Sequence, residues 1–182
     1  MKKLAAILLL AALLIPACAL AYYDAVSGAT IDEPTPIYGW LNARMATRTG
    51  PGTKYEEPGT FFASGDSVKI ISMGYSSVPW VQVEANIGGK LMRVYTGFKR
   101  IDGVDQYDVP QEANLDIAAT VNTATVPTYG PGSRFAKYGF TLAKGKRVTI
   151  IDFEGDYAMC DYQPNKNSDC RRLWVPRFVL SY

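Results

Sequence analysis

An internal duplication constrains this chain more than any other feature of its sequence. The tripeptide Gly-Pro-Gly occurs at residues 50–52 and again at residues 130–132, a shift of 80 positions. The same shift carries the β-branched stretch 68–71 onto 148–151, and it shortens to 79 near the end of the chain. Self-similarity at a fixed period indicates two diverged copies of one folding unit.

Each copy has the pattern of β structure. Residues 67–73 and 147–153 are rich in β-branched side chains, and each is followed by a strand led by an aromatic, within 79–85 and 156–162. The pair at 88–89 is Gly-Gly, a hairpin turn signal. No amphipathic helix of useful length follows the first 21 residues. Short strands at this spacing in roughly 60 residues predict a small β-barrel in each copy.

The first 21 residues have the pattern of a secretory signal peptide. Two lysines precede an apolar run over residues 4–15, and Ala-Leu-Ala at 19–21 provides small residues for cleavage. The apolar run is too short for an ordinary membrane span. The sequence therefore predicts a protein that is secreted or associated with the cell envelope, with no transmembrane segment in the mature chain. An alternative interpretation makes Cys18 a lipid-modified cysteine.

Charge argues against a nucleic-acid partner. Removing residues 1–21 removes two of the 19 bases and none of the 17 acids, which leaves 17 of each. Because affinity for nucleic acid depends on cations that meet phosphates, a mature chain with no net charge is a poor candidate for it.

The chain contains no histidine. This excludes Ser-His-Asp and Cys-His catalysis, and it excludes zinc sites that need an imidazole ligand. An acidic run over residues 152–161 could serve a cation or a glycosidase, but its spacing is typical of a solvated hairpin turn. We therefore expect no catalytic residues, no metal and no cofactor.

Two cysteines remain after the leader, Cys160 and Cys170. An even number of cysteines in an exported chain favours a disulfide, and these two flank the turn that the stretch 164–169 predicts. We expect a cross-strand bridge over this hairpin. The alternative is a pair of free, buried thiols.

The residues around each Gly-Pro-Gly resemble the bacterial SH3-like repeat, the SH3b family of exported proteins. The matching positions in the first copy are Arg48, Thr49, Gly50, Pro51, Tyr55, Gly59 and Gly65. Those in the second copy are Gly130, Pro131, Gly132, Phe135, Gly139 and Gly145, with Thr128 in place of the arginine.

The resemblance implies an all-β chain of two tandem small SH3-like β-barrels. The first domain is expected at residues 37–102 and the second at 119–182. Polar, proline-containing segments at 22–36 and 103–118 are typical of linkers.

The resemblance also implies a secreted, non-catalytic protein that binds cell-wall peptidoglycan or a peptide, and not an enzyme. Two linked weak sites would gain avidity if both engage at once. The alternative is a structural or protein-interaction module, in which the copies pack into one rigid body and present an interface to another exported protein. Exposed aromatic grooves would favour the first function, and buried aromatics the second.

Aromatic side chains are the candidate ligand-binding residues, since aromatic platforms bind peptides and sugars. The candidates are Tyr55, Trp80, Tyr95, Phe98, Phe135, Tyr157 and Trp174. In an SH3-like barrel the loops that carry Tyr55 and Trp80 would flank one groove. The alternative is that these rings pack in the cores of the two barrels.

Overall fold

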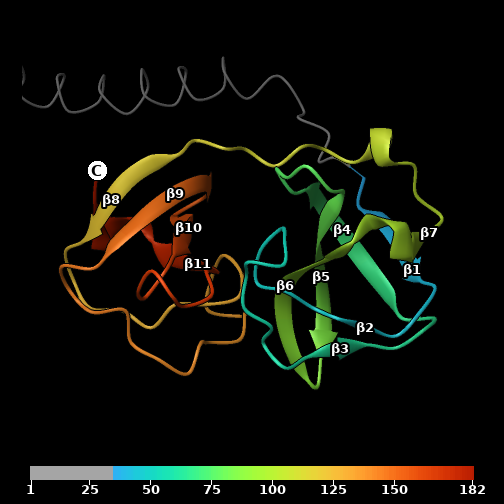
Figure 1. Ribbon diagram of the computed structural model, residues 1–182, viewed down its shortest axis with the longest axis horizontal. Coiled ribbons are helices and arrows are strands. Elements are labelled where there is room, and N and C mark those ends of the chain that lie inside the picture. Colours follow the sequence, from blue (N-terminus) through green and yellow to red (C-terminus); the bar gives the residue numbers. More distant parts are fainter. Residues whose placement is uncertain (1–34) are drawn as a thin grey trace, which may run out of the picture. The chain divides into compact units, whose positions relative to one another are not determined.

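The protein folds from β-branched and aromatic strands, and the predicted all-β class is confirmed (Figure 1). The computed structural model describes residues 35–182, so the predicted signal peptide, the Cys18 alternative and nearly all of segment 22–36 lie outside the described residues. Pro36–Tyr182 form one compact unit. Within residues 35–182 there are three short 3-10 helices and no α-helix.

The first repeat forms an antiparallel sheet with the spatial order β6-β5-β4-β1-β7. Its strands are β1 (Ile37–Leu41), β4 (Ser67–Met73), β5 (Trp80–Ile87), β6 (Lys90–Gly97) and β7 (Ile101–Asp102). A separate two-stranded sheet pairs β2 (Met45–Ala46) with β3 (Phe61–Phe62). The 3-10 helices η1 (Phe98–Arg100) and η2 (Gln106–Asp108) lie before and after β7.

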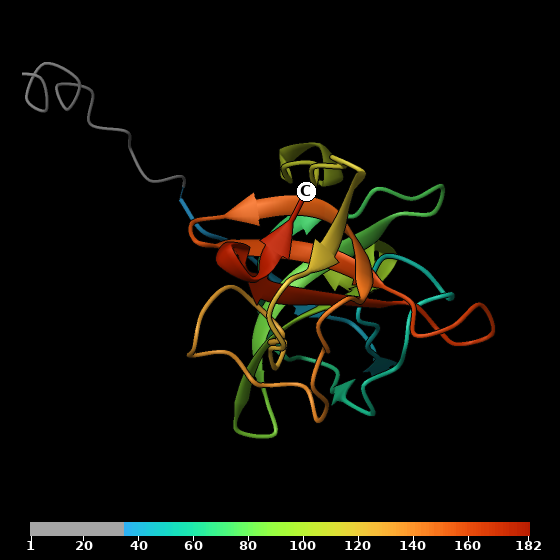
Figure 2. The same cartoon turned by 90° about the vertical axis from the view of Figure 1, so that its left-hand side faces the viewer.

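The second repeat forms a sheet with the equivalent order, β11-β10-β9-β8-β12. Its strands are β8 (Ile117–Val121), β9 (Arg147–Glu154), β10 (Tyr157–Tyr162), β11 (Arg171–Pro176) and β12 (Leu180–Ser181), with η3 (Arg177–Val179) before the last. Figure 2 faces the end of the molecule that carries this sheet. The two sheets share one topology, as expected of a duplicated unit.

None of the three sheets closes into a barrel through strand pairing among the described residues. Beyond its pairing with β5, β6 forms an isolated bridge from Tyr95 to Arg48, and β11 forms the equivalent bridge from Trp174 to Thr128. A loop, rather than a further strand, therefore lies beside each of these outer strands.

Each sheet packs its inner face into its own core. The first core includes Leu41, Val81, Val83 and Val94, all at most 1% exposed. The second core includes Val121, Ile150, Leu173 and Val175, which are completely buried. Both sheets have a register shift at the equivalent place. It lies between Ile70 and Ser72 of β4 in the first sheet, and between Ile150 and Asp152 of β9 in the second. A β-bulge of this kind increases strand twist and helps a small sheet to wrap around its core.

The Gly-Pro-Gly tripeptide is explained by close packing. A Cβ atom at Gly50 would overlap the ring of Tyr55, and one at Gly130 would overlap the ring of Phe135. Each loop thus folds its aromatic residue back onto its own first glycine. Only a residue without a side chain permits this approach.

Candidate functional site

The loop that carries Gly-Pro-Gly in each repeat packs against the last long strand of the other repeat. The Glu56 amide donates to the Cys170 carbonyl at 2.9 Å, and the Cys170 amide donates to the Lys54 carbonyl at 3.0 Å. In the other direction, the Ala136 amide donates to the Leu91 carbonyl at 2.9 Å. Residues 56 and 136 are 80 positions apart, and 91 and 170 are 79 apart. The same contact is therefore made twice, once from each repeat to the other.

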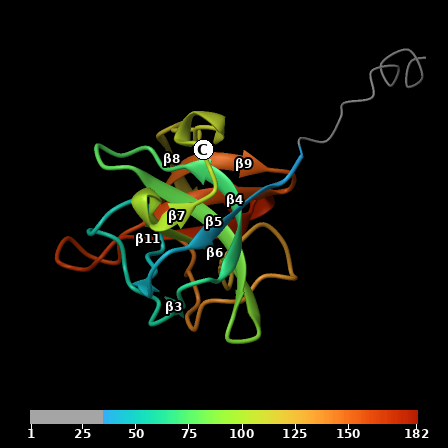
Figure 3. The same cartoon turned by 90° about the vertical axis from the view of Figure 1, so that its right-hand side faces the viewer.

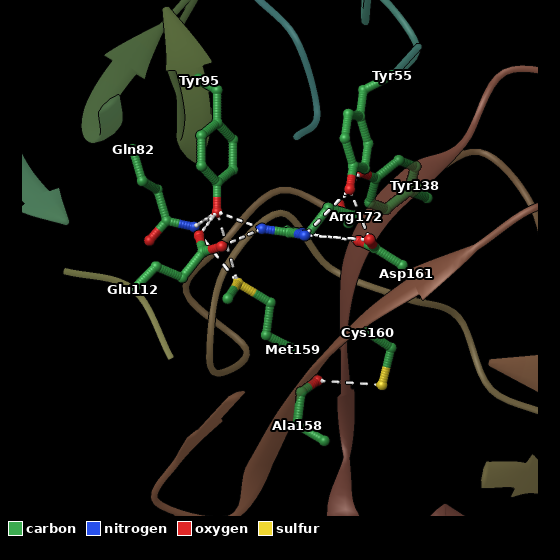
Figure 4. Close-up of polar contacts among 10 residues, drawn as sticks. All are labelled: Tyr55, Gln82, Tyr95, Glu112, Tyr138, Ala158, Met159, Cys160, Asp161 and Arg172. Carbon is green, nitrogen blue, oxygen red and sulfur yellow. Dashed lines mark hydrogen bonds and ion pairs between the residues drawn. The ribbon is translucent and has the colours of Figure 1, made fainter. Parts of the chain in front are cut away.

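Arg172 on β11 lies at the centre of one of these contacts (Figure 4). Its guanidinium faces the rings of Tyr55 and Tyr95, at 5.3 and 5.6 Å from their centroids. It holds Asp161 through two bonds, Nε to Oδ1 at 2.7 Å and Nη2 to Oδ2 at 3.0 Å. Its Nη1 pairs with Glu112. Arg172 therefore links the first repeat, the second repeat and the segment between them.

The two tyrosines complete this buried cluster, which we call the Arg172 cluster. The hydroxyl of Tyr55 donates to Asp161 Oδ2 at 2.6 Å, and that of Tyr95 donates to Glu112. Burial raises the pKa of both tyrosines, so both remain neutral donors. Burial also raises the pKa of Glu112, although Arg172 opposes the shift. All five side chains are satisfied, as buried polar groups must be to avoid a desolvation cost.

Arg93 on β6 occupies the equivalent place in the other contact. It lies over the rings of Phe135 and Trp174, at 5.4 and 5.7 Å from their centroids. Its Nε donates to Glu84 at 2.9 Å, and its Nη2 donates to Glu154 at 3.0 Å. The Glu84 side chain is 10% exposed, but that of Glu154 is 50% exposed. This second ionic contact, the Arg93 cluster, is therefore open to water on one side.

These contacts place four of the seven candidate aromatics between the repeats. Tyr55, Tyr95, Phe135 and Trp174 are at most 4% exposed. Phe98 is half-buried against the first core, and Tyr157 is half-buried against the apolar cluster of Ile151, Met159 and Trp174. Two of the seven candidates, Tyr55 and Trp80, line one hollow together.

That hollow lies on the first repeat, between its Gly-Pro-Gly loop and the β4–β5 connection, and we call it the first-repeat groove. Tyr55 and Trp80 both line it, but Tyr95 and Phe98 do not. Its volume is about 480 Å³, and its exposed walls include Lys54, Tyr75 and Val78. The side chains of Tyr75 and Val78 are 64% and 59% exposed. Apolar walls with a few hydroxyls and one cation suit an uncharged or anionic polymer segment.

The second repeat lacks one wall of such a groove. The β4–β5 connection has six residues, 74–79, whereas the equivalent β9–β10 connection has only two, Gly155 and Asp156. The residues that would correspond to Tyr75 and Val78 are therefore absent, and Tyr157 directly follows a tight turn.

The predicted disulfide is wrong for this structure: Cys160 and Cys170 are both free thiols. The strand register pairs Cys160 with Leu173, three positions beyond Cys170. This offset separates the two along the hairpin by about 10 Å, more than a disulfide can span. Figure 4 shows the Cys160 thiol turned toward the Ala158 carbonyl and away from the Arg172 cluster. Burial raises the pKa of Cys160 to about 12 and that of Cys170 to about 11, so neither is a reactive thiolate.

The acidic run at 152–161 is only partly a solvated turn. Glu154 and Asp161 hold Arg93 and Arg172, while Asp156 is exposed beside Gly155 in the turn. Within residues 35–182, no three acidic or cysteine side chains lie close enough together to hold a metal ion.

Sequence reasoning missed Glu112, which the predicted linker 103–118 supplies to the Arg172 cluster. The Glu112 amide donates to the Met73 carbonyl at 2.8 Å, and the Met73 amide donates to the Pro110 carbonyl at 2.8 Å. These bonds hold the segment against the first sheet. The available signal was the alignment of Arg93 with Arg172, since two arginines at equivalent strand positions call for acidic partners.

Comparison with protein-family models, with curated proteins and with solved structures returned no significant match. In the part of the chain that the structure describes, we found no helix long and apolar enough to cross a membrane.

Proposed function

We propose that the protein is an exported, non-catalytic binding protein whose ligand site is the first-repeat groove. The ligand would be a segment of cell-wall peptidoglycan or a peptide. The observation that supports this is the hollow itself: a volume of about 480 Å³ between two loops, with Tyr75, Val78 and Trp80 along one wall. Aromatic walls of this kind supply apolar area, and a hydroxyl group such as that of Ser77 can orient a polar ligand.

The proposal includes the finer description of the fold and of location. Each repeat is interpreted as a diverged SH3-like barrel, because a long first loop and the β4–β5 connection flank one groove in that architecture. Export rests on the leader-like pattern of residues 1–21. Binding through one repeat replaces the expectation of two equivalent sites, because the second repeat has the two-residue turn.

The test is retention of the purified protein on insoluble peptidoglycan, beside a glycan-free peptide. Tyr75→Ala should weaken retention at least about tenfold, the loss typical of an aromatic anchor in an interface. Phe178→Ala is the matched control, since Phe178 is 78% exposed and lies on η3, outside the groove. Equal retention of wild type and Tyr75→Ala, with both folded by circular dichroism, would contradict the assignment.

A second function is supported by the buried aromatics. Because Tyr55, Tyr95, Phe135 and Trp174 hold the repeats together, the unit is suited to a rigid scaffold that presents its outer surface to another exported protein. This function predicts no retention on peptidoglycan and unchanged partner binding by Tyr75→Ala. Capture of a protein partner by both variants would favour it over the groove.

A further inference from the structure

The outer faces of the two sheets differ at equivalent positions. Figure 3 faces the end of the molecule that carries the first sheet. Tyr38 and Trp40 of its strand β1 are 55% and 52% exposed. The shift of 80 residues places Ala118 and Thr120 of β8 at the same two positions of the second sheet. One sheet therefore carries two projecting aromatic rings where the other carries two small side chains.

The small side chains leave a hollow in the second sheet. It has a volume of about 500 Å³, and its lining includes Ala118, Thr120, Arg147, Thr149, Asp161 and Gln163. The projecting ring of Trp40 is held in place from beneath, since it packs on Gly103 so closely that a Cβ atom there would lie 2.5 Å from the indole. A fixed, exposed indole is a suitable anchor for a hollow of this size.

We propose that the chain associates with itself head to tail, with the Tyr38–Trp40 ridge of one copy in the second-sheet hollow of another. This inference does not depend on the proposed function, because neither surface includes the first-repeat groove. In a dimer of this kind one copy still has an unoccupied ridge and the other an unoccupied hollow. The contact is therefore heterologous, and further copies can add to either end.

Access to the two faces fixes how the copies meet. The β5–β6 side of the first sheet is covered by the second repeat, which buries Gln82, Arg93 and Tyr95. The β10–β11 side of the second sheet is covered in turn by the first repeat. A partner can therefore approach only over β4, β1 and β7 of one sheet and β9, β8 and β12 of the other. We therefore stack the two sheets face to face, with the covered side of each copy at the opposite end from that of the other. In this arrangement β1 of one copy lies over β8 of the other, and β7 lies over β9.

Charge supports this orientation. Asp102 of β7 is paired in register with Trp40, and Arg147 of β9 is paired in register with Thr120. With β7 over β9, the Asp102 carboxylate of one copy faces the Arg147 guanidinium of the next. Both side chains are exposed, and neither takes part in an ion pair within residues 35–182. The opposite orientation would direct the partner into the covered half of each sheet.

Sedimentation velocity of the purified full chain tests the proposal. We expect the average mass of the wild type to rise with concentration past that of a dimer, with a dissociation constant tighter than about 1 mM. Trp40→Ala removes the ridge and Thr120→Trp fills the hollow, and each variant alone should remain a monomer. An equimolar mixture of the two should form a dimer that grows no further, because each partner retains one working surface. Phe178→Ala is the control for loss of an exposed aromatic and should behave as the wild type.

Three outcomes would overturn the proposal. They are a wild type that stays monomeric up to about 1 mM, a Trp40→Ala variant that associates as the wild type does, and a mixture that stays monomeric. Charge exchange gives an independent test should Trp40→Ala lose its fold. Asp102→Arg and Arg147→Asp should each weaken association at least about tenfold, and the double variant should recover it. Failure of the double variant to recover would also count against the proposed orientation.

Discussion

The Arg172 and Arg93 clusters are made by equivalent residues of the two repeats, yet they differ in access to water. The side chains of Glu112 and Asp161, the partners of Arg172, are 1% and 18% exposed. Glu154, one partner of Arg93, is 50% exposed. Each arginine has one carboxylate at the equivalent place, because Glu84 is the register partner of Arg93 and Asp161 is that of Arg172. The second carboxylate, Glu154 or Glu112, comes from a different part of the chain in the two clusters. The free energy of each contact should follow its burial rather than its geometry.

The largest effect is expected at the more buried arginine. Arg172→Ala leaves Glu112 and Asp161 without a cation in a largely buried site, and removing one partner of a buried ion pair costs about 3 to 5 kcal/mol. Urea unfolding followed by tryptophan fluorescence measures the loss. A change in the free energy of unfolding below about 1 kcal/mol, as for a surface pair, would show that the cluster is hydrated.

The next effect concerns the loops that reach each cluster. Gly50→Ala and Gly130→Ala each place a methyl group against the ring of Tyr55 or Phe135. Overpacking of this kind costs about 2 to 3 kcal/mol, and the two losses should be similar because the local packing is the same. Gly59→Ala is not a suitable control, since Gly59 has a φ of +71°. Gly97→Ala is suitable, because a Cβ atom there would meet nothing within 4 Å and its φ is −67°.

A smaller loss is expected at the more open arginine. Arg93→Ala leaves Glu84 near Arg134, whose Nη2 lies 3.6 Å from its Oε1, and Glu154 can turn to water. We expect about 1 to 2 kcal/mol, the cost of leaving one partly buried polar group unsatisfied. The same urea experiment applies. Equal losses for Arg93→Ala and Arg172→Ala would remove the distinction between the clusters.

The smallest effect is a pH dependence carried by Glu112. Burial raises its folded pKa above the ordinary value of 4.5, despite the opposing charge of Arg172. The folded state then binds a proton that the unfolded state has already lost, so the contribution of this carboxyl to stability falls as pH rises through the window above 4.5. The difference in unfolding free energy between wild type and Glu112→Gln should therefore be greater near pH 4.5 than at neutral pH. A difference that grows toward neutral pH would show that the pKa is lowered instead.

The sequence predicted the duplication and the all-β class. It did not predict that Tyr55 and Phe135 reach across to the other repeat. Two similar repeats offer each loop two similar strands, and nothing local distinguishes Arg93 from Arg172 as its partner. The choice depends on how the whole unit packs.

The cysteines show a second limit of sequence reasoning. Nine residues between Cys160 and Cys170 fit a hairpin, but the pairing register decides whether two side chains in a hairpin face each other. Here the last pair of β10 and β11 before the connecting loop is Tyr162 with Arg171, so Cys170 lies in the loop and has no partner on β10. Spacing alone cannot reveal an offset of this kind.

Because each Gly-Pro-Gly loop packs on the other repeat, the two repeats cannot be separated without exposing the strands that these loops cover. β6 and β11 are edge strands, and exposed edges of this kind are templates for uncontrolled pairing with other chains. In the intact unit, the Leu91 carbonyl and the Arg93 amide are bonded to Ala136 and Tyr129 of the second repeat. The Cys170 amide and carbonyl are bonded to Lys54 and Glu56 of the first. Each repeat thus caps polar groups on the edge strand of the other, and we expect either repeat produced alone to expose that edge and to aggregate more readily.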